Sequence, residues 1–108
     1  MDYAEKAIWE QENTAALAGV FATISDISSM QDFLRDVMTE KEIVEISARL
    51  QAAIMLSQGR KYGEIIAATK LSSRTVARIS DWLQNGTGGY RKVIESIHQT
   101  HLPPACAE

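Results

Sequence analysis

The sequence predicts an all-α fold of six helices in one domain. Apolar residues recur at spacings of three, four and seven along most of the 108 residues, which is the periodicity of amphipathic helices. No stretch of useful length alternates apolar and polar residues as a half-buried strand does, and no internal repeat is present. We expect residues 1–101 to form the single domain and residues 102–108, which contain Pro103 and Pro104, to form a flexible tail.

The first two predicted helices lie in the N-terminal third of the chain. Residues 3–24 carry an apolar series that no proline interrupts, so they predict one long amphipathic helix. The polar run around Asp26 then breaks the pattern, and a short second helix is expected to begin near Ser29 or Met30. One face of this second helix carries Phe33, Leu34, Val37 and Met38.

A capping box predicts the start of the third helix. The Thr39 hydroxyl can accept from the amide three residues on, while Glu42 reaches back to the amide of Thr39. Gly59 suits the left-handed position that follows a helix end, because it has no Cβ. The apolar stripe between these two signals consists of Ile43, Ile46, Leu50, Ala53, Ile54 and Leu56.

Three shorter helices are expected after Gly59, over residues 62–68, 73–84 and 90–98. A tight turn joins the first two, and Ser72 or Ser73 can cap the second. The last helix should turn Val93, Ile94 and Ile97 inward. Two crossed helices need an apolar skeleton to lock against each other, and here it is supplied by Ile65, Ile66, Leu71, Val76 and Ile79.

The composition excludes several classes of protein. One cysteine, Cys106, cannot form an internal disulfide, and together with His98 and His101 it cannot supply four zinc ligands, so we assign no metal and expect a reduced, cytoplasmic protein. The longest apolar run, residues 52–56, is too short to span a membrane. The sequence has no nucleophile with a base and an orienting acid and no phosphate-binding glycine loop, so an enzyme is not expected.

The charge is distributed unevenly along the chain. The net charge is −3, yet residues 1–59 carry four Lys and Arg against ten Asp and Glu, whereas residues 60–92 carry seven against two. Charges farther than about 8 Å from a contact are screened at physiological salt. A protein that touches DNA with its basic third can therefore be acidic elsewhere.

The predicted helices of this basic third form a helix-turn-helix, over about residues 62–84. In that motif the second helix enters the major groove and presents its N-terminal side chains to base edges. Short side chains permit close approach, and Arg74 can donate two hydrogen bonds to guanine. The expected base-edge residues are Ser72, Ser73, Arg74, Thr75 and Ala77, and the expected phosphate contacts are Arg60, Lys61 and Lys70.

Seven short motifs stand at a characteristic joint spacing: FLRDVMT at 33–39, EI at 42–43, ARL at 48–50, LSQG at 56–59, YGEII at 62–66, SSRTVARI at 72–79 and GGY at 88–90. With these motifs the chain resembles the tryptophan repressor superfamily from about residue 30 to residue 94. The resemblance implies a DNA-binding regulator whose six helices are intertwined with a second copy, and whose two reading helices meet successive major grooves about 34 Å apart on a palindromic operator. Lys70 stands where many helix-turn-helix proteins have a glycine with positive φ.

The same resemblance implies a corepressor pocket. Arg49 and Arg78 fall where the tryptophan repressors have two arginines that sandwich the indole ring, and Thr39 also matches. Arginine suits this task because its guanidinium stacks on aromatic faces and binds carboxylates in a bidentate manner. Backbone carbonyls near Asp36 and Met38 of the partner chain would accept from the ligand's ammonium.

Two residues of the pocket differ from the tryptophan repressors. Ile79 stands where they have glycine, and Trp82 stands where they have serine, so both positions carry more bulk. From the residues alone, Arg49 is also a simple partner for Glu45 or Glu42 on its own helix.

We therefore expect a cytoplasmic, homodimeric DNA-binding repressor of transcription with L-tryptophan as corepressor and double-stranded operator DNA as its target. Two alternatives remain open. One is a ligand-independent dimeric helix-turn-helix regulator, in which Ile79 and Trp82 fill the pocket. The other is a helical protein-interaction module without DNA binding, which would dock through its acidic first half.

Overall fold

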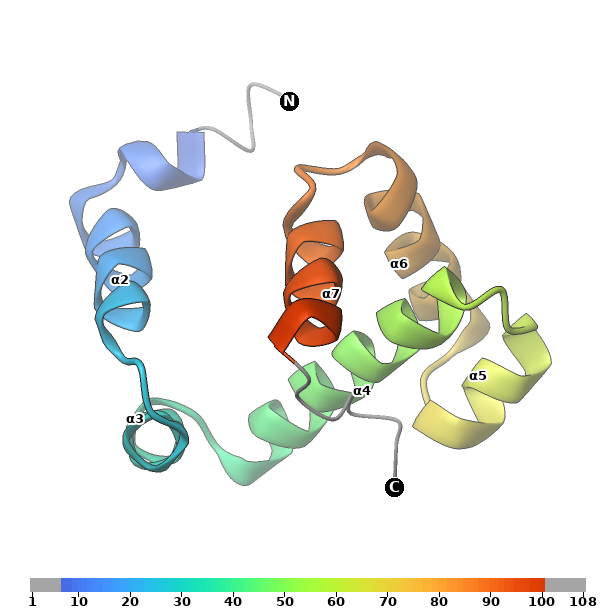
Figure 1. Ribbon diagram of the computed structural model, residues 1–108, viewed down its shortest axis with the longest axis horizontal. Coiled ribbons are helices and arrows are strands. Elements are labelled where there is room, and N and C mark those ends of the chain that lie inside the picture. Colours follow the sequence, from blue (N-terminus) through green and yellow to red (C-terminus); the bar gives the residue numbers. More distant parts are fainter. Residues whose placement is uncertain (1–6, 101–108) are drawn as a thin grey trace. The chain divides into compact units, whose positions relative to one another are not determined.

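The computed structural model describes residues 7–100, with side chains up to residue 97 (Figure 1). Within this range all regular structure is helical and no strand occurs, so the predicted all-α fold of six α-helices is confirmed. The expected tail, residues 102–108, lies outside the described residues. The elements are the 3-10 helix η1 (Ile8–Glu10) and the α-helices α2 (Glu12–Thr23), α3 (Ile27–Val37), α4 (Glu40–Ser57), α5 (Tyr62–Thr69), α6 (Ser73–Asn85) and α7 (Gly89–Thr100).

The chain divides into two compact units, residues 1–43 and residues 44–108. The first unit holds η1, α2, α3 and the start of α4, and the second holds the rest of α4 with α5, α6 and α7. The prediction of a single domain over residues 1–101 stays a prediction. No helix in the described range is both long enough and apolar enough to cross a lipid bilayer.

The prediction of one continuous helix over residues 3–24 is wrong within the described residues. Gln11 is extended, with φ −78° and ψ 134°, and separates η1 from α2. The Thr14 hydroxyl lies within hydrogen-bonding distance of the Ile8 carbonyl and, at 3.0 Å, of the Gln11 carbonyl. A side chain that offers the backbone a local partner competes with the helical ladder, and apolar periodicity carries no sign of that competition.

Helix α3 begins earlier than predicted, because Asp26 caps it. The Asp26 carboxylate accepts from the amide of Ser29 at 2.9 Å, so the helix starts at Ile27 rather than near Ser29 or Met30. An aspartate before a helical stripe is a recognised start signal. Phe33 on α3 meets Phe21 on α2 edge to face, with ring centroids 5.3 Å apart. On the predicted apolar face Phe33, Leu34 and Met38 are half-buried, but Val37 is exposed.

Both ends of α4 are fixed as predicted. The Thr39 amide donates to Glu42 at 2.8 Å and the Glu42 amide donates to the Thr39 hydroxyl at 3.1 Å, which confirms the capping box. At the other end Gly59 has φ 77°, and its amide donates to Leu56 while the amide of Arg60 donates to Met55. These two hydrogen bonds form a Schellman motif, in which glycine is favoured at the left-handed position because it has no Cβ.

The hydrophobic core of the second unit draws on α4, α5, α6 and α7. From the predicted skeleton, Ile65, Val76 and Ile79 have no exposed surface, and Ile66 and Leu71 pack against them. Two residues predicted to point inward are instead about half exposed, Val93 on α7 and Ile46 on α4. The buried core residues are Ala52, Ala53, Ile54, Met55, Ile65, Val76, Ile79 and Ile94.

Gly86 ends α6 at a position that has no room for a side chain. A Cβ on Gly86 would lie 2.5 Å from the Trp82 carbonyl oxygen, and a backbone atom cannot swing aside as a side chain can. We expect Gly86→Ala to lower the free energy of unfolding by about 1–3 kcal/mol. Gly63→Ala is the matched control, because nothing lies within 4 Å of its Cβ position. Urea unfolding measures the free energy of unfolding of both variants. An equal effect of the two changes would contradict the conclusion that position 86 has no room for a side chain.

The three capping carboxylates predict loss of stability in acid. Hydrogen bonds from Ser29 lower the pKa of Asp26 from 3.8, and bonds from Thr39 lower the pKa of Glu42 from 4.5. The Arg60 side chain, followed by the Lys61 amide, lowers the pKa of Glu64 from 4.5. A lowered folded-state pKa stabilises the fold above the unfolded value, and that contribution is lost as the pH falls through the folded value.

The free energy of unfolding should therefore decline below about pH 4.5 and be insensitive to these groups at neutral pH. Glu42→Gln keeps an oxygen that can accept from the Thr39 amide but removes the titration. Urea unfolding between pH 7 and pH 3 should show a shallower decline for this variant than for the wild type. Parallel curves would show that the capping box does not contribute to the acid response.

Candidate nucleic-acid interface

Hydrogen bonds of Thr69 and Lys70 hold the turn between α5 and α6. Lys70 is left-handed, with φ 63° and ψ 14°, and its amide donates to Ile66 at 2.9 Å. Many helix-turn-helix proteins have a glycine with positive φ at this position, as noted above, and a non-glycine residue there costs roughly 1 kcal/mol. Buried Thr69 donates through its hydroxyl to Ile65 at 2.7 Å and accepts from the amide of Leu71 at 3.3 Å. The geometry of the turn is therefore set by its own side chains as well as by the core.

Ser72 caps the helix predicted to read DNA. Its hydroxyl oxygen accepts from the amide of Thr75 at 3.1 Å, which selects Ser72 from the two predicted capping serines. The side chain of Thr75 is half-buried and lies 3.0 Å from the Ser72 hydroxyl, so part of its hydrogen-bonding capacity is used by the cap. Four of the five predicted base-edge residues are exposed, namely Ser72, Ser73, Arg74 and Ala77.

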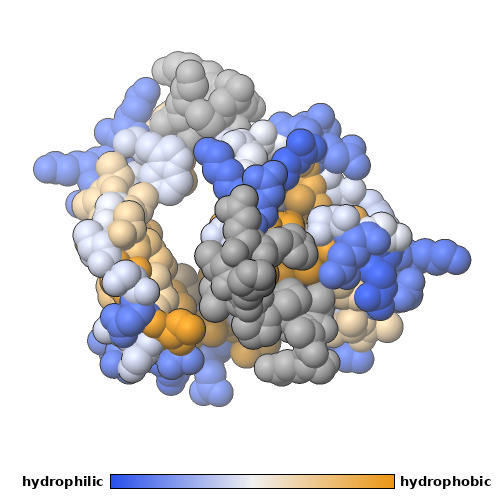
Figure 2. All heavy atoms as spheres, viewed as in Figure 1, coloured by the Kyte–Doolittle hydropathy of each residue, from blue (hydrophilic) through white to orange (hydrophobic). Residues whose placement is uncertain are grey.

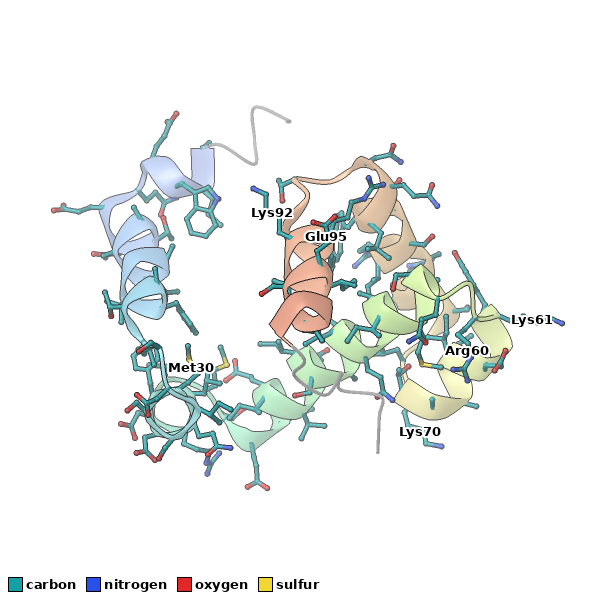
Figure 3. All side chains as sticks on the ribbon, viewed as in Figure 1. Met30, Arg60, Lys61, Lys70, Lys92 and Glu95 are labelled. Atoms are coloured by element: carbon teal, nitrogen blue, oxygen red, sulfur yellow. The ribbon has the colours of Figure 1, made fainter. Side chains whose placement is uncertain are left out.

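The cations of this segment differ in how they are paired. Arg60 binds Glu64 through Nε at 3.0 Å and through Nη2 at 2.9 Å, so its charge is largely balanced by its neighbour. Lys61, Lys70 and Arg74 form no ion pair within the described residues. Figure 3 shows the side chains of Lys61 and Lys70 extending outward from the α5 region. Hydrophilic side chains gather over the same edge of this unit in Figure 2.

The predicted pocket arginines occupy different environments on α4 and α6. Arg49 is 39% exposed and lies 3.6 Å from Glu45, the partner that the helical spacing allowed. Its Nε is buried and has no hydrogen-bond partner in the structure. Burial raises the pKa of Tyr90 on α7, and the positive charge of Arg49 opposes that rise. Arg78 is exposed, whereas its neighbour Ile79 has no exposed surface and belongs to the core.

The other three predicted ligand contacts lie in the first unit. Thr39 is exposed, and its hydroxyl oxygen accepts from the Glu42 amide, which leaves the hydroxyl proton for another acceptor. Asp36 is exposed near the end of α3. Met38 ends α3, with its amide donating to Leu34 at 2.9 Å. Arg49, Arg78 and Ile79 belong to the second unit, so the predicted pocket residues come from both.

Two exposed aromatic residues of the interface region were not singled out as DNA contacts. Tyr62 is 42% exposed and follows directly after Lys61, and Trp82 is 39% exposed on α6. An aromatic residue directly after the basic pair Arg60 and Lys61 is a sequence signal for nucleic-acid contact. This signal was missed, because helical periodicity explains Tyr62 as the first residue of α5. No group of three metal-ligating side chains lies together in the described part of the chain, and His101 and Cys106 fall outside that part.

Comparison with known proteins decides the family. A sequence model of the family described as "Trp repressor protein" matches residues 12–98. The chain belongs to the Trp repressor family. A protein of Bacillus subtilis (strain 168), "Uncharacterized protein YerC", is 28% identical over 78 residues, which cover 72% of this chain and 75% of that protein. A crystal structure described as a TrpR-like protein from Eubacterium eligens ATCC 27750 superimposes with a TM-score of 0.78 at 30% identity, covering 83% of this chain and 93% of that one.

Membership in the Trp repressor family indicates a DNA-binding regulator of transcription. The family is regulatory rather than enzymatic. The helix-turn-helix of α5 and α6, with its capped second helix and exposed Arg74, lies inside the matched region.

Proposed function

We propose that this member of the Trp repressor family is a homodimeric repressor that places α6 in the major groove of operator DNA and takes L-tryptophan as corepressor. The observation that carries the DNA-binding part is the exposed Arg74 in the first turn of a helix whose start is fixed by Ser72. A side chain at that place reaches base edges while the helix N-terminus faces the phosphates. Lys61 and Lys70 supply charge for the phosphates on either side.

The proposal of a dimer is supported by the lack of a core in the first unit. None of the described residues of α2 or α3 is buried. Helices this short are marginal in water unless an apolar face packs against another surface, and apolar side chains exposed to this extent mark an interaction site. A second copy supplies such a surface in a closed, symmetric arrangement. The exposed large apolar residues of this unit are Ile8, Trp9, Leu17, Val20, Ile27 and Val37.

The proposal of a corepressor is supported by the unused hydrogen-bonding capacity of Arg49. A buried Nε without an acceptor costs free energy, because it has lost water and gained nothing in return. The Arg49 side chain is 39% exposed, so a ligand carboxylate would bind the exposed part of its guanidinium, and the planar group would stack on a flat ring. A ligand that binds best when α6 has the spacing of the operator shifts the population toward that state. A coupling of roughly 1–3 kcal/mol changes the affinity for DNA by 5- to 150-fold.

A ligand-independent regulator is the second candidate, and Ile79 favours it. This side chain has no exposed surface, so it fills space where the tryptophan repressors have a glycine. In this case α6 is held by the core alone, and Arg78 contacts phosphate. The two candidates agree on DNA binding and differ only in the response to a ligand.

Variants of the basic segment test the DNA interface. Arg74→Ala should reduce the binding free energy that separates the preferred base pair from the others by about 1–3 kcal/mol at one position. The reason is that the change removes a bidentate contact with a base. Lys61→Ala should weaken binding to all sequences alike and reduce the salt slope by about 1. Lys41→Ala, an exposed lysine outside the basic segment, is the control. Fluorescence anisotropy with a selected operator and a shuffled duplex, at several salt concentrations, measures the sequence preference and the salt dependence of DNA binding. No effect of either change would favour a protein-interaction module instead.

Calorimetric titration with L-tryptophan tests the corepressor. Saturable heat at millimolar ligand, with tighter DNA binding, is the expected result. Arg49→Lys keeps the charge but loses the planar stack, so its ligand affinity should fall at least about tenfold. Arg35→Lys on α3 is the matched control. The absence of heat together with unchanged DNA affinity would leave the ligand-independent regulator. The mass in solution, measured on the same sample, tests the dimer.

A further inference from the structure

A groove of about 350 Å³ lies within the second unit, on the α4, α6 and α7 side chains. Its size falls within the range of small-molecule sites, roughly 300–1,000 Å³. None of the residues assigned above to DNA or to the corepressor lines it. The lining residues are Leu56, Ser57, Ser80, Leu83, Gln84, Arg91, Ile94 and Glu95.

The apolar part of the groove continues the core. Ile94 is 8% exposed, and Leu56 and Leu83 are half-buried side chains that pack against the core cluster. A hydrocarbon group that binds against these three residues loses its contact with water, which favours binding, and breaks no hydrogen bond of theirs.

The charged part of the groove is provided by α7. Arg91 and Glu95 are four residues apart, so they lie on the same face of the helix. Nε of Arg91 donates to the Leu83 carbonyl at 2.7 Å, which fixes the guanidinium against the last turn of α6 and leaves its two Nη groups as donors. Figure 3 shows Glu95 on the side of α7 that faces α6, and Lys92 on another side.

Arg91 and Glu95 do not neutralise each other. The spacing allows an ion pair, yet none joins these two residues in the described structure. Ser80 and Gln84 line the same groove and add a hydroxyl and an amide group to it. The groove therefore presents one fixed cation, one anion and neutral polar groups beside an apolar floor.

We propose that this groove binds a small zwitterion with an apolar side chain, that is, a free hydrophobic amino acid. The ligand's carboxylate binds the Nη groups of Arg91, its ammonium binds Glu95, and its side chain lies on Leu56, Leu83 and Ile94. A simple anion fits less well because Glu95 repels it, and a simple cation fits less well because Arg91 does. The site is separate from the proposed corepressor pocket, since it uses neither Arg49 nor Arg78.

Backbone amide shifts in NMR spectra test this site, with L-leucine and L-phenylalanine as probes. Saturable shifts at Leu83, Gln84 and Ile94 are expected at millimolar ligand. Glu95→Gln keeps the shape but removes the charge, and Arg91→Gln removes the cation, so each should weaken binding at least about tenfold. Lys92→Gln, on the same helix but outside the groove lining, should not change the affinity. Because Arg91→Gln also removes the hydrogen bond to α6, Glu95→Gln is the variant that separates binding from folding.

Two ligand analogues complete the test. 4-Methylpentanoate lacks the ammonium group and 3-methylbutylamine lacks the carboxylate, and each should bind at least about tenfold more weakly than leucine. Arg49→Lys should leave binding in the groove unchanged. The proposal is overturned if neither amino acid gives saturable shifts, if Glu95→Gln binds as well as the wild type, or if an analogue binds as well as leucine. If a second copy of the chain covers the groove, neither amino acid will give saturable shifts. DNA binding would remain intact in that case, so the failure of this proposal can be told apart from a failure of the proposed function.

Discussion

The geometry of the DNA-reading segment depends on the complete burial of Ile65, Val76 and Ile79. Ile65 holds α5 and the other two hold α6, and none of the three has any exposed surface. Burying one such side chain is worth about 1.5–3 kcal/mol, so together they weigh heavily in a domain whose total stability is typically 5–15 kcal/mol. The stabilisation from burying these three side chains exceeds the cost of roughly 1 kcal/mol for the left-handed backbone of Lys70. The strained turn persists because both of its helices are anchored in the core.

The two units obtain their order in different ways. The second unit has a buried core and two helix ends fixed by Ser72 and Gly59, so its helices are ordered by contacts within the unit. The first unit has capping hydrogen bonds and one edge-to-face pair of phenylalanines but no buried residue on α2 or α3. Local capping defines where its helices begin, whereas burial against another surface must supply most of their stability. This difference is why a dimer is proposed from the first unit and DNA reading from the second.

Local signals in the sequence predicted more than patterns that depend on packing. The capping box of Thr39 and Glu42, the serine cap of α6 and the left-handed Gly59 each involve residues within a few positions, and all are confirmed. The break at Gln11 was missed because apolar residues recur at helical spacing on both sides of it, so the periodicity does not mark the one extended residue. The groove beside α7 was also missed, since it exists only where three helices meet. The spacing of Arg91 and Glu95 was visible in the sequence, but it predicts an ion pair rather than a site.

The pairing of charges in the reading segment bears on specificity. Non-specific affinity for DNA grows with the number of cations that neutralise phosphates. Glu64 holds Arg60 through two short contacts, and the Arg60 side chain in turn lowers the pKa of Glu64, so the Glu64 carboxylate stays ionised at neutral pH and keeps Arg60 occupied. Six further Lys and Arg remain in residues 60–92, and Lys61, Lys70 and Arg74 among them form no ion pair within the described residues. The phosphate contacts proposed for this segment therefore rest on Lys61 and Lys70 rather than on Arg60, while the base contact proposed for Arg74 carries the sequence preference.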